Sequence, residues 1–383
     1  MLRFLLLLIR SLAPGARGPS TGARRPAETP GRGCAILIAA HNEEGTIGAT
    51  VTRLRERLRE WPESRIWVVA DRCADATAAE AERAGAQVAL RSSGGLGKCA
   101  VITWWLEQHE SAWRACDAVL ILDADTRLAA GSLRALREAM LIDGAEVVQA
   151  FVAPLAETGA GRMAGWSEVL MQRIDDEARR RCGWSVPLRG TGMAFRGERL
   201  AEIAPRLHTL AEDLEMDVLL AARGVHVRFV PAATIYDPKP QQADGASRQR
   251  ARWLQGQLQV LGGYWREIGR ALATGGVGAF FLLFLLLMRP KIALIGLRLI
   301  GLGLSLALLW FVSGGPGPTL FAWTSAGLVM DALYYLAGAR FVDDPRRYLI
   351  DLLTVPRYAA MWLQTALLTF SKRRQKIWLR AGR

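Results

Sequence analysis

Two long apolar segments near the C-terminal end constrain the fold of this chain most. Residues 292–312 and 319–339 are each about 20 residues long, enough for a helix to cross the roughly 30 Å hydrocarbon core of a bilayer. The linker between them, SGGPGP, is uncharged and rich in turn-forming residues. The outer ends of the pair carry the basic residues Arg289, Lys291, Arg340, Arg346 and Arg347. The positive-inside rule therefore predicts a helical hairpin with both ends in the cytoplasm.

Two further apolar stretches flank this hairpin. Residues 277–288 are short for a membrane span and end at a basic cluster, and residues 349–370 contain polar side chains within one broad helical face. We interpret both as helices in the membrane interface, with four true spans as the alternative. At the other end of the chain, residues 1–33 combine a short apolar run with a Pro-, Gly- and Arg-rich linker. The run is either a weak interfacial anchor or the remnant of a misassigned start.

Basic residues exceed acidic ones by 49 to 36, which gives a formal net charge of +13. After Asp351 the chain has no acidic residue, and its tail carries Arg357, Lys372, Arg373, Arg374, Lys376, Arg380 and Arg383. A basic tail that follows hydrophobic segments favours an anionic inner leaflet over a nucleic acid, and the sequence has no zinc-finger or RNA-recognition signature. The five cysteines include no CxxC pair, so we expect reduced thiols and no zinc site.

Short β-rich runs alternate with helical patterns in the first two thirds of the chain. We therefore expect a doubly wound, mainly parallel α/β sheet over residues 34–270, followed by a membrane region over residues 271–383. The predicted strands are 35–40, 65–71, 87–91, 118–124, 145–152 and 225–230, and the early helices are 46–60 and 77–85. Thr77 and Glu80 have the spacing of a capping box at the start of the second helix.

Polar residues end three of the predicted strands: His41, Asn42 and Glu43 after the first, Asp71 in the second, and Asp123 with Asp125 at the fourth. Ligands of such sheets bind at the carboxyl ends of the strands. Because residues i and i+2 of a strand point to the same side, Asp123 and Asp125 are expected to face one ligand. Two close carboxylates repel each other unless a cation lies between them, and oxygen ligands suit Mg²⁺ or Mn²⁺. The pair therefore predicts a metal that binds a diphosphate.

The segment SRQRARWLQGQ, residues 247–257, holds Gln249, Arg252 and Trp253 at positions i, i+3 and i+4. On a helix these three side chains share a face. Arginine suits bidentate contact with phosphate, and tryptophan offers a flat surface for a sugar ring. Upstream, Glu212 and Asp213 stand at a predicted helix start, where an acidic first turn is by itself favoured by the helix dipole.

Together these motifs resemble glycosyltransferase family 2, especially its membrane-bound bacterial branch related to cellulose, chitin and hyaluronan synthases. They occur in the order of the family: AHNEE, Asp71, Gly97-Lys98, Asp123-Ala-Asp125, Gly190-Thr191-Gly192, Glu212-Asp213 and Gln249-x-x-Arg252-Trp253. The resemblance covers residues 34–270 and implies the GT-A fold of nucleotide-diphospho-sugar transferases. It further implies an inverting, metal-dependent enzyme of the inner membrane, whose cytoplasmic domain transfers sugar from a nucleotide-sugar, with UDP expected, to a lipid-linked or glycan acceptor.

The resemblance also implies a role for each matched residue. Nucleotide-sugar binding would involve His41, Asn42, Glu43, Asp71, Lys98 and Asp123, and the metal ligands would be Asp123 and Asp125. Contacts to the acceptor and the diphosphate would come from Gly190, Thr191, Gly192, Gln249, Arg252 and Trp253. The catalytic group would comprise Asp213 as general base, Glu212 and Arg252. Such an enzyme acts in exopolysaccharide or cell-envelope glycan synthesis, where polysaccharide-assembly proteins are candidate partners.

Other functions fit the residues less well. Residues 91–100 lack the first glycine of a phosphate-binding loop and have Cys99 where Ser or Thr is needed, and no GxGxxG follows the first strand. A processive polysaccharide synthase remains an alternative, although two spans are few for a product channel in a monomer. An alternative of another class is a non-catalytic subunit that binds nucleotide-sugar and scaffolds a polysaccharide complex.

Overall fold

The structure is a computed structural model of the chain. It describes residues 31–155, 159–209, 211–238, 243–287, 291–311, 315–356, 359–360 and 362, with the side chains of residues 159–160, 243–250, 252–253, 285–287 and 292–293 left out. The expectations for the N-terminal apolar run, for half of the stretch 349–370 and for the basic tail therefore lie outside the described residues.

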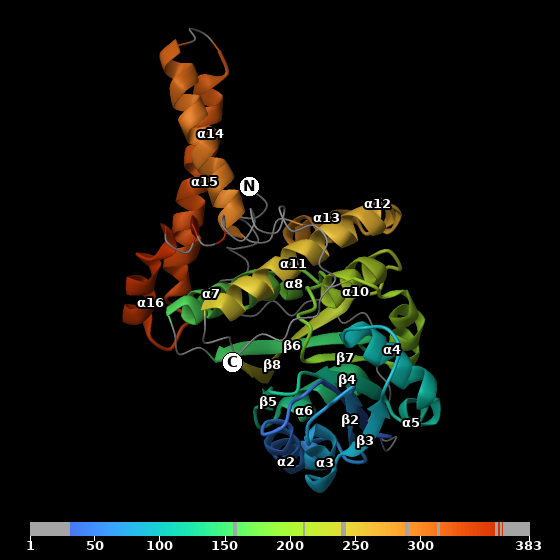
Figure 1. Ribbon diagram of the computed structural model, residues 1–383. Helices are drawn as coiled ribbons and strands as arrows, with labels where there is room; N and C mark the ends of the chain where they lie inside the picture. The colour runs from blue at the N-terminus through green and yellow to red at the C-terminus, as the bar shows by residue number, and fades with distance from the viewer. Residues whose placement is uncertain are drawn as a thin grey trace.

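One open sheet forms the centre of the described fold (Figure 1). Its order is β3 (Gln87–Arg91), β2 (Arg65–Asp71), β1 (Cys34–Ala40), β4 (Ala118–Leu122), β7 (Met193–Phe195), β6 (Val147–Leu155), β8 (Val227–Pro238) and β5 (Arg127–Leu128). All six predicted strands are present. The prediction of a mainly parallel sheet is wrong in part, because β7 pairs antiparallel with both β4 and β6, and β5 pairs antiparallel with β8. Two strands of two and three residues are too short to leave an alternating pattern in the sequence.

Helices cover both faces of the sheet, and the alternation of side chains along each strand separates two apolar cores. Ile36 and Ile38 of β1 pack in one core with α2 (Ile47–Arg57), α3 (Thr77–Arg83) and α6 (Ser132–Arg137). Leu37 packs in the other core with α4 (Lys98–Gln108), α5 (Glu110–Arg114), α9 (Gly197–Ile203) and α10 (Glu212–Ala221). This three-layer arrangement leaves the carboxyl ends of the central parallel strands free for a site.

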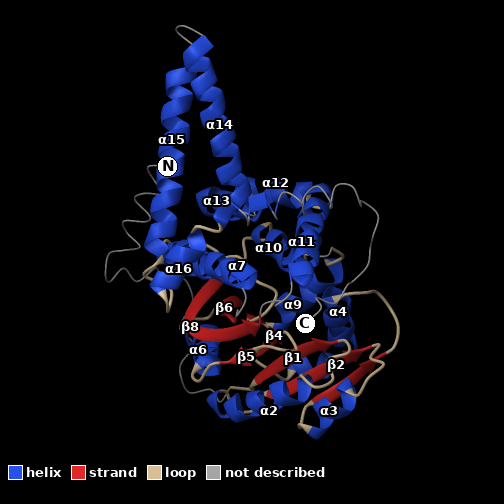
Figure 2. Cartoon of the chain, turned by 60° about the vertical axis from the view of Figure 1, so that its left-hand side comes forward, coloured by secondary structure: helices blue, strands red, loops and turns tan. Residues whose placement is uncertain are grey.

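A further set of helices lies on the same side of the sheet as α10 (Figure 1). It consists of α7 (Gly159–Leu170), a π-helical segment (Met171–Asp176), α8 (Glu177–Arg181), α11 (Ala243–Gly263), α12 (Trp265–Thr274) and α13 (Gly276–Leu287). Leu282 and Leu283 of α13 belong to the same apolar core as α10, so this predicted interfacial segment also packs on that side of the sheet. Figure 2 shows the set as a platform between the sheet and the projecting hairpin.

The hairpin consists of α14 (Lys291–Phe311) and α15 (Gly317–Gly338), close to the predicted bounds (Figure 2). Both helices are long and apolar enough to cross a membrane. Within the hairpin, Arg298 forms an ion pair with Asp331 and donates to the carbonyl of Gly327 at 3.2 Å, which joins the two helices at one level.

The base of the hairpin packs on the platform through aromatic residues. Tyr348 of α16 (Pro345–Leu352) is buried against Leu170 and Ile174, and Asp351 accepts hydrogen bonds from Arg162 at 2.9 Å and from Trp166 at 3.1 Å. Hairpin and globular domain are therefore held by specific polar contacts as well as by apolar packing.

This junction predicts a test of the packing. A Cβ atom at Gly338 would lie 2.6 Å from Tyr348 Oη and 2.7 Å from Leu170 Cδ2, both of which are buried, so Gly338→Ala should destabilise the protein by about 1–3 kcal/mol. The matched control is Gly296→Ala in α14, where a Cβ meets nothing within 4 Å. Thermal unfolding of the detergent-purified proteins measures the difference, and equal midpoints for both variants would contradict the tight junction.

Candidate active site

The loop after β1 carries three of the predicted site residues, and it is held by the next strand and helix. His41 Nδ1 lies 2.6 Å from the carbonyl oxygen of Asp71, at the end of β2. Asn42 has a positive φ of 55°, an uncommon conformation outside glycine that often marks a functional turn. Its side-chain oxygen accepts a hydrogen bond from the amide of Ala74 at 2.8 Å. The structure thus brings His41, Asn42 and Asp71 together at one edge of the sheet.

The predicted capping box is wrong, and its residues hold this loop instead. The N-cap of α3 is Ala76, and Thr77 is already helical. The hydroxyl of Thr77 accepts from the amide of Glu43 at 2.7 Å, and Glu80 Oε2 accepts from the amide of Gly45 at 2.8 Å. Both side chains therefore satisfy amides of a distant loop rather than those of their own helix.

Asp71 is a buried carboxylate that two arginines neutralise. Arg91 donates to Oδ1 at 2.5 Å, and Arg72 donates to the same oxygen at 3.0 Å. Arg91 is the register partner of Asp71 on β3, whereas Arg72 adopts a positive φ of 50°. Sequence reasoning missed both arginines, because the pairing of Asp71 with Arg91 depends on a strand register that the sequence does not display.

Lys98 is the point at which several predicted residues meet. It is the first residue of α4, and its Nζ donates to Asp123 Oδ1 at 2.5 Å and to the carbonyl of Gly190 at 2.7 Å. Burial opposes the charge of Lys98, but Asp123, Glu212 and Asp213 outweigh it and raise the pKa of the ammonium. The ammonium group is therefore charged at neutral pH and interacts with three carboxylates that the sequence predicts to be catalytic or donor-binding.

Asp123 and Asp125 lie just beyond β4 rather than within it. The predicted strand 118–124 ends at Leu122, and Asp125 lies in a turn, so the argument from strand alternation is wrong. A local turn orients the pair instead, since Thr126 Oγ1 donates to the carbonyl of Asp123 at 2.9 Å. The side chain of Asp123 is 43% exposed, which leaves it open to a ligand at the edge of the sheet.

Residues 188–192, here called the glycine loop, are held along their whole length. The amide of Leu188 donates to Asp217 Oδ1 at 3.0 Å, and the amide of Gly192 donates to the carbonyl of Ile121 at 2.9 Å. The hydroxyl of Thr191 accepts from the amide of Asp123 at 3.1 Å. The loop is thus fixed directly against the turn that carries the two aspartates.

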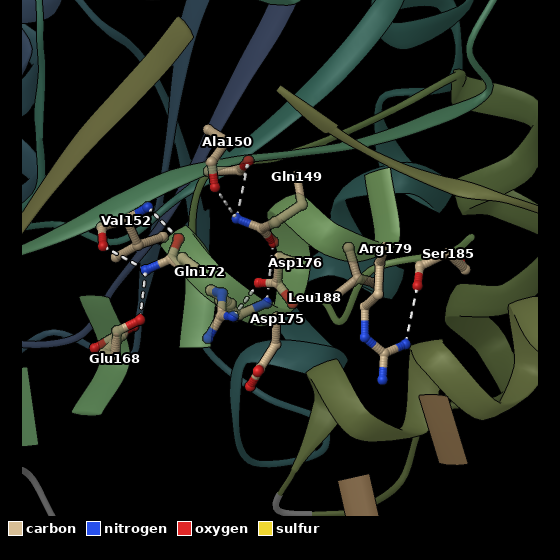
Figure 3. A network of polar contacts seen from close by, with 12 residues as sticks. Gln149, Ala150, Val152, Glu168, Gln172, Asp175, Asp176, Arg179, Ser185 and Leu188 are labelled. Carbon is tan, nitrogen blue, oxygen red and sulfur yellow. Dashed lines mark hydrogen bonds and ion pairs between the residues drawn. The ribbon is translucent and has the colours of Figure 1, made fainter. Parts of the chain in front are cut away.

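Gln149 is the buried residue that completes this arrangement. Its Oε1 accepts from the amide of Arg189 at 3.0 Å, and its Nε2 donates to the carbonyl of Thr191 at 3.0 Å. Figure 3 shows Gln149 beside Ala150, whose carbonyl accepts from the same Nε2 at 2.9 Å. Gln149 and Asp217 were missed by sequence reasoning. Gln149 left a signal, because it is a polar residue within the apolar run EVVQAFV of a predicted strand, and such a residue needs partners when buried.

The two glycines of this loop are required for different reasons. Gly190 has a φ of 78°, and a Cβ there would lie 3.8 Å from Glu212. Gly192 has a φ of 67°, and a Cβ there would lie 2.7 Å from Ile235 Cγ1 of β8. The lack of a side chain at Gly192 therefore permits close packing against β8, whereas contact of the glycines with an acceptor stays a prediction.

Glu212 and Asp213 are the first two residues of α10, as predicted, and their negative charges attract the ammonium group of Lys98. Glu215, one turn later, is fully buried and accepts hydrogen bonds from the amides of His208 and Thr209 at 2.9 Å each, and from the hydroxyl of Tyr264. Glu215 therefore ties the start of α10 to the junction of α11 and α12.

Gln249, Arg252 and Trp253 lie on α11, and their side chains are outside the described residues. The backbone of α11 is nevertheless positioned closely. A Cβ at Gly256 would lie 2.5 Å from the Cβ of Ala211, the residue that precedes Glu212. The turn of α11 that holds Arg252 and Trp253 is thus the one immediately before the contact with the start of α10.

Carboxylate oxygens, such as those of Asp123 and Asp125, are the kind of ligand that a small divalent cation prefers. Magnesium usually binds one or two carboxylates and completes its shell with water and substrate phosphates. The side chain of Asp123 is 43% exposed, which leaves it accessible to a cation, and one of its oxygens also accepts a hydrogen bond from Lys98. Among the described residues, no group of three or more His, Cys, Asp and Glu side chains forms a closed metal site.

Comparison with known sequences gives the family. The sequence model of glycosyl transferase family group 2 matches residues 118–336, more than half of the chain, and that of glycosyl transferase family 2 matches residues 35–200. The chain belongs to glycosyltransferase family 2. The protein is therefore a glycosyltransferase, and its mixed eight-stranded sheet fits the GT-A fold of nucleotide-sugar transferases.

Individual relatives are distant. The probable glycosyltransferase YdaM of Bacillus subtilis (strain 168) is 24% identical over 237 residues, 59% of this chain and 55% of that protein, so the match spans about half the length of the relative. The mannosyltransferase PcManGT from Pyrobaculum calidifontis, solved with GDP-Man and Mn²⁺, is 17% identical with a TM-score of 0.58 over 97% of this chain and 95% of its own. Mannosyl-3-phosphoglycerate synthase from Rubrobacter xylanophilus is 18% identical, covers 62% of this chain and 75% of its own, and has a TM-score of 0.44.

The environment of Lys98 in this glycosyltransferase predicts how its contribution to the free energy of unfolding varies with pH. Because its pKa is raised on folding, the charge of Lys98 stabilises the fold fully below its ordinary pKa of 10.5, and this stability is lost as pH rises through the folded-state pKa. The difference in unfolding free energy between the wild type and Lys98→Met should therefore be constant between about pH 6 and 9. Unfolding measurements across that range test it, and a difference that shrinks steadily from pH 6 would contradict the assignment.

The contacts of Gln149 predict a second effect. Gln149→Leu leaves the amide of Arg189 and the carbonyl of Thr191 without their partner, which should cost about 1–3 kcal/mol for each buried group and lower transferase activity. Gln87→Leu, at an exposed position of edge strand β3, is the control. Unfolding and activity are measured on both variants, and a Gln149 variant as stable and active as the control would show that the glycine loop does not depend on this side chain.

Proposed function

We propose that this glycosyltransferase is an inverting, metal-dependent enzyme that transfers a sugar from a UDP-sugar to a lipid-linked or polysaccharide acceptor at the cytoplasmic face of the membrane. The observation that carries the proposal is the position of Lys98, which binds Asp123 on the donor side and the glycine loop on the other side, close to Asp213. One charged group thus keeps the two halves of a transfer site together.

On the donor side, the nucleoside would bind near His41, Asn42 and Asp71, at the ends of β1 and β2. Asp123 and Asp125 would hold Mg²⁺ or Mn²⁺ together with the diphosphate. The metal, when bound, would stabilise the negative charge that develops on the departing nucleoside diphosphate. Lys98 adds a fixed positive charge beside the same group, and the ion pair with Asp123 keeps it in place.

On the acceptor side, Asp213 would take the proton of the acceptor hydroxyl while that oxygen attacks the anomeric carbon. The bond from this carbon to the diphosphate oxygen breaks in the same displacement, so the configuration inverts. Arg252 of α11, with Gln249 and Trp253, would contact the diphosphate and the acceptor. The tight contact of Gly256 with Ala211 supports this, because it brings that helix against the start of α10.

A membrane position is supported by where apolar side chains are exposed. Trp310 and Phe311 near the tip of α14 are at least 80% exposed, and Trp323 of α15 is 63% exposed. Trp265 and Phe280 of α12 and α13 are exposed as well. Side chains of this kind favour lipid contact, so the hairpin would insert while the platform helices lie in the interface.

The role of Asp213 gives a direct prediction. Asp213→Asn should lower the rate of transfer by about 10²–10⁴-fold, because the acceptor hydroxyl loses its general base, while nucleotide affinity stays the same. Glu110→Gln, in the exposed first turn of α5, is the matched control. Turnover is followed by product formation and affinity by calorimetry with UDP; near-normal turnover of Asp213→Asn would remove it as the base.

A panel of nucleotide-sugars tests the reaction as a whole. The purified protein is assayed for nucleotide release with and without Mg²⁺ or Mn²⁺, with membranes supplied as acceptor, and UDP-sugars should give the fastest metal-dependent release. GDP-sugars belong in the panel, and faster release from them would overturn the donor assignment. The size of the product, measured by mass spectrometry, distinguishes a single transfer from a polymer, and a lack of release from every donor would favour a scaffold subunit.

A further inference from the structure

Two consecutive buried carboxylates end the π-helical segment between α7 and α8, and each binds a different cation. Asp175 is 6% exposed and accepts a hydrogen bond from Lys291 Nζ at 2.5 Å. Asp176 is 2% exposed and forms an ion pair with Arg189. Figure 3 shows that Asp176 points toward Gln149 and Leu188, whereas Asp175 points away from them. Neighbouring residues of a helix point in directions about 100° apart, so the pair reaches two separate structures.

The partner of Asp176 belongs to the glycine loop. Arg189 is almost completely buried, and its backbone amide donates to Gln149 Oε1 at 3.0 Å. Burial opposes the charge of Arg189, but Asp176 outweighs it, so that the pKa of the guanidinium is raised. A buried ion pair adds little net stability, but separating its partners leaves a buried charge without compensation. The pair therefore holds both side chains in one geometry. Arg189 thus fixes the end of the loop next to Gly190.

The partner of Asp175 belongs to the hairpin. Lys291 is the first residue of α14, and its Nζ also donates to the hydroxyl of Tyr334 on α15 at 2.6 Å. One ammonium group therefore joins both hairpin helices to the carboxylate. The chain of contacts runs from the hairpin through Lys291, Asp175, Asp176 and Arg189 to the glycine loop.

We propose that Asp175, Asp176 and Arg189 are positioning residues that make the geometry of the glycine loop depend on the seating of the membrane hairpin. Asp175 and Asp176 share a backbone, so a shift of the hairpin that releases Lys291 reorients both carboxylates together. Arg189 then loses the carboxylate that fixes the first half of the glycine loop, while the contacts among His41, Asn42 and Asp71 on the donor side stay in place. Sugar transfer to the acceptor depends on this path, and nucleotide binding does not.

This inference rests on the proposed function for its acceptor side, so its test includes a measurement that needs no activity. The full chain in lipid nanodiscs is compared as wild type, Asp175→Asn, Lys291→Met and Lys291→Arg by hydrogen–deuterium exchange of the peptides that cover residues 188–192. Exchange in these peptides should be about tenfold faster for the first two variants, and Lys291→Arg, which keeps the charge, should restore the wild-type rate.

Kinetics gives the second measurement. Asp175→Asn and Lys291→Met should each lower kcat/KM for the acceptor by about tenfold to a hundredfold, because small misplacements cost that much, while the affinity for UDP stays unchanged. The double variant should be no worse than either single one, since both changes break the same contact. Additive losses, or an equal loss of UDP affinity, would overturn the proposal.

Asp351→Asn is the matched control. It breaks a different polar contact, made by Arg162 and Trp166 of α7 with Asp351 of α16, and leaves Lys291 and Asp175 unchanged. Wild-type exchange in residues 188–192 is expected for this control. If it accelerates exchange there as much as Asp175→Asn, or if neither variant changes exchange, the path through Asp175 and Asp176 is refuted. Absence of any nucleotide release by the wild type would refute the proposed function alone, because the exchange measurement stands apart from it.

Discussion

The contact of Lys98 with Asp123 and with the carbonyl of Gly190 is the interaction on which the rest of the site depends. Without a cation at this place, two aspartates after β4 and two acidic residues at the start of α10 would repel one another across a small space. Lys98 balances them from the first turn of α4 and anchors a backbone carbonyl with the same group. The separate elements β4, α4 and α10 become one site through a single charge.

Around this contact, buried polar groups do most of the positioning. Gln149, Asp217 and Glu215 each accept or donate several hydrogen bonds with backbone groups of loops that carry functional residues. Such networks are stable only when every member is satisfied, which makes them specific for one loop geometry. The candidate site is therefore positioned largely by buried polar side chains in the sheet and in α10.

Much of this could be read from the sequence. The alternation of apolar runs located β1, β2 and β3 closely, and the length of the C-terminal runs located the hairpin helices. Residues placed by local pattern at strand ends, such as Asp71 and Asp123, do gather at one edge of the sheet. These features depend on neighbours in the chain, and local periodicity records them.

What the sequence could not show depends on contacts between distant segments. The partner of Asp71 follows from the register of β2 and β3, and the insertion of β7 follows from a three-residue strand that has no pattern of its own. Thr77 and Glu80 match the spacing of a capping box, but in the structure they accept hydrogen bonds from the loop after β1. The strand register, the insertion of β7 and the partners of Thr77 and Glu80 depend on tertiary contacts, which produce no periodic pattern in the sequence.

The antiparallel direction of β7 determines which loops meet at the carboxyl end of β4. Since β4 leaves the sheet at the same rim where the chain enters β7, an outgoing turn and an incoming loop stand side by side there. Reversing one short strand therefore lets a single rim of the sheet carry both the turn with Asp123 and the loop with Gly190 and Thr191.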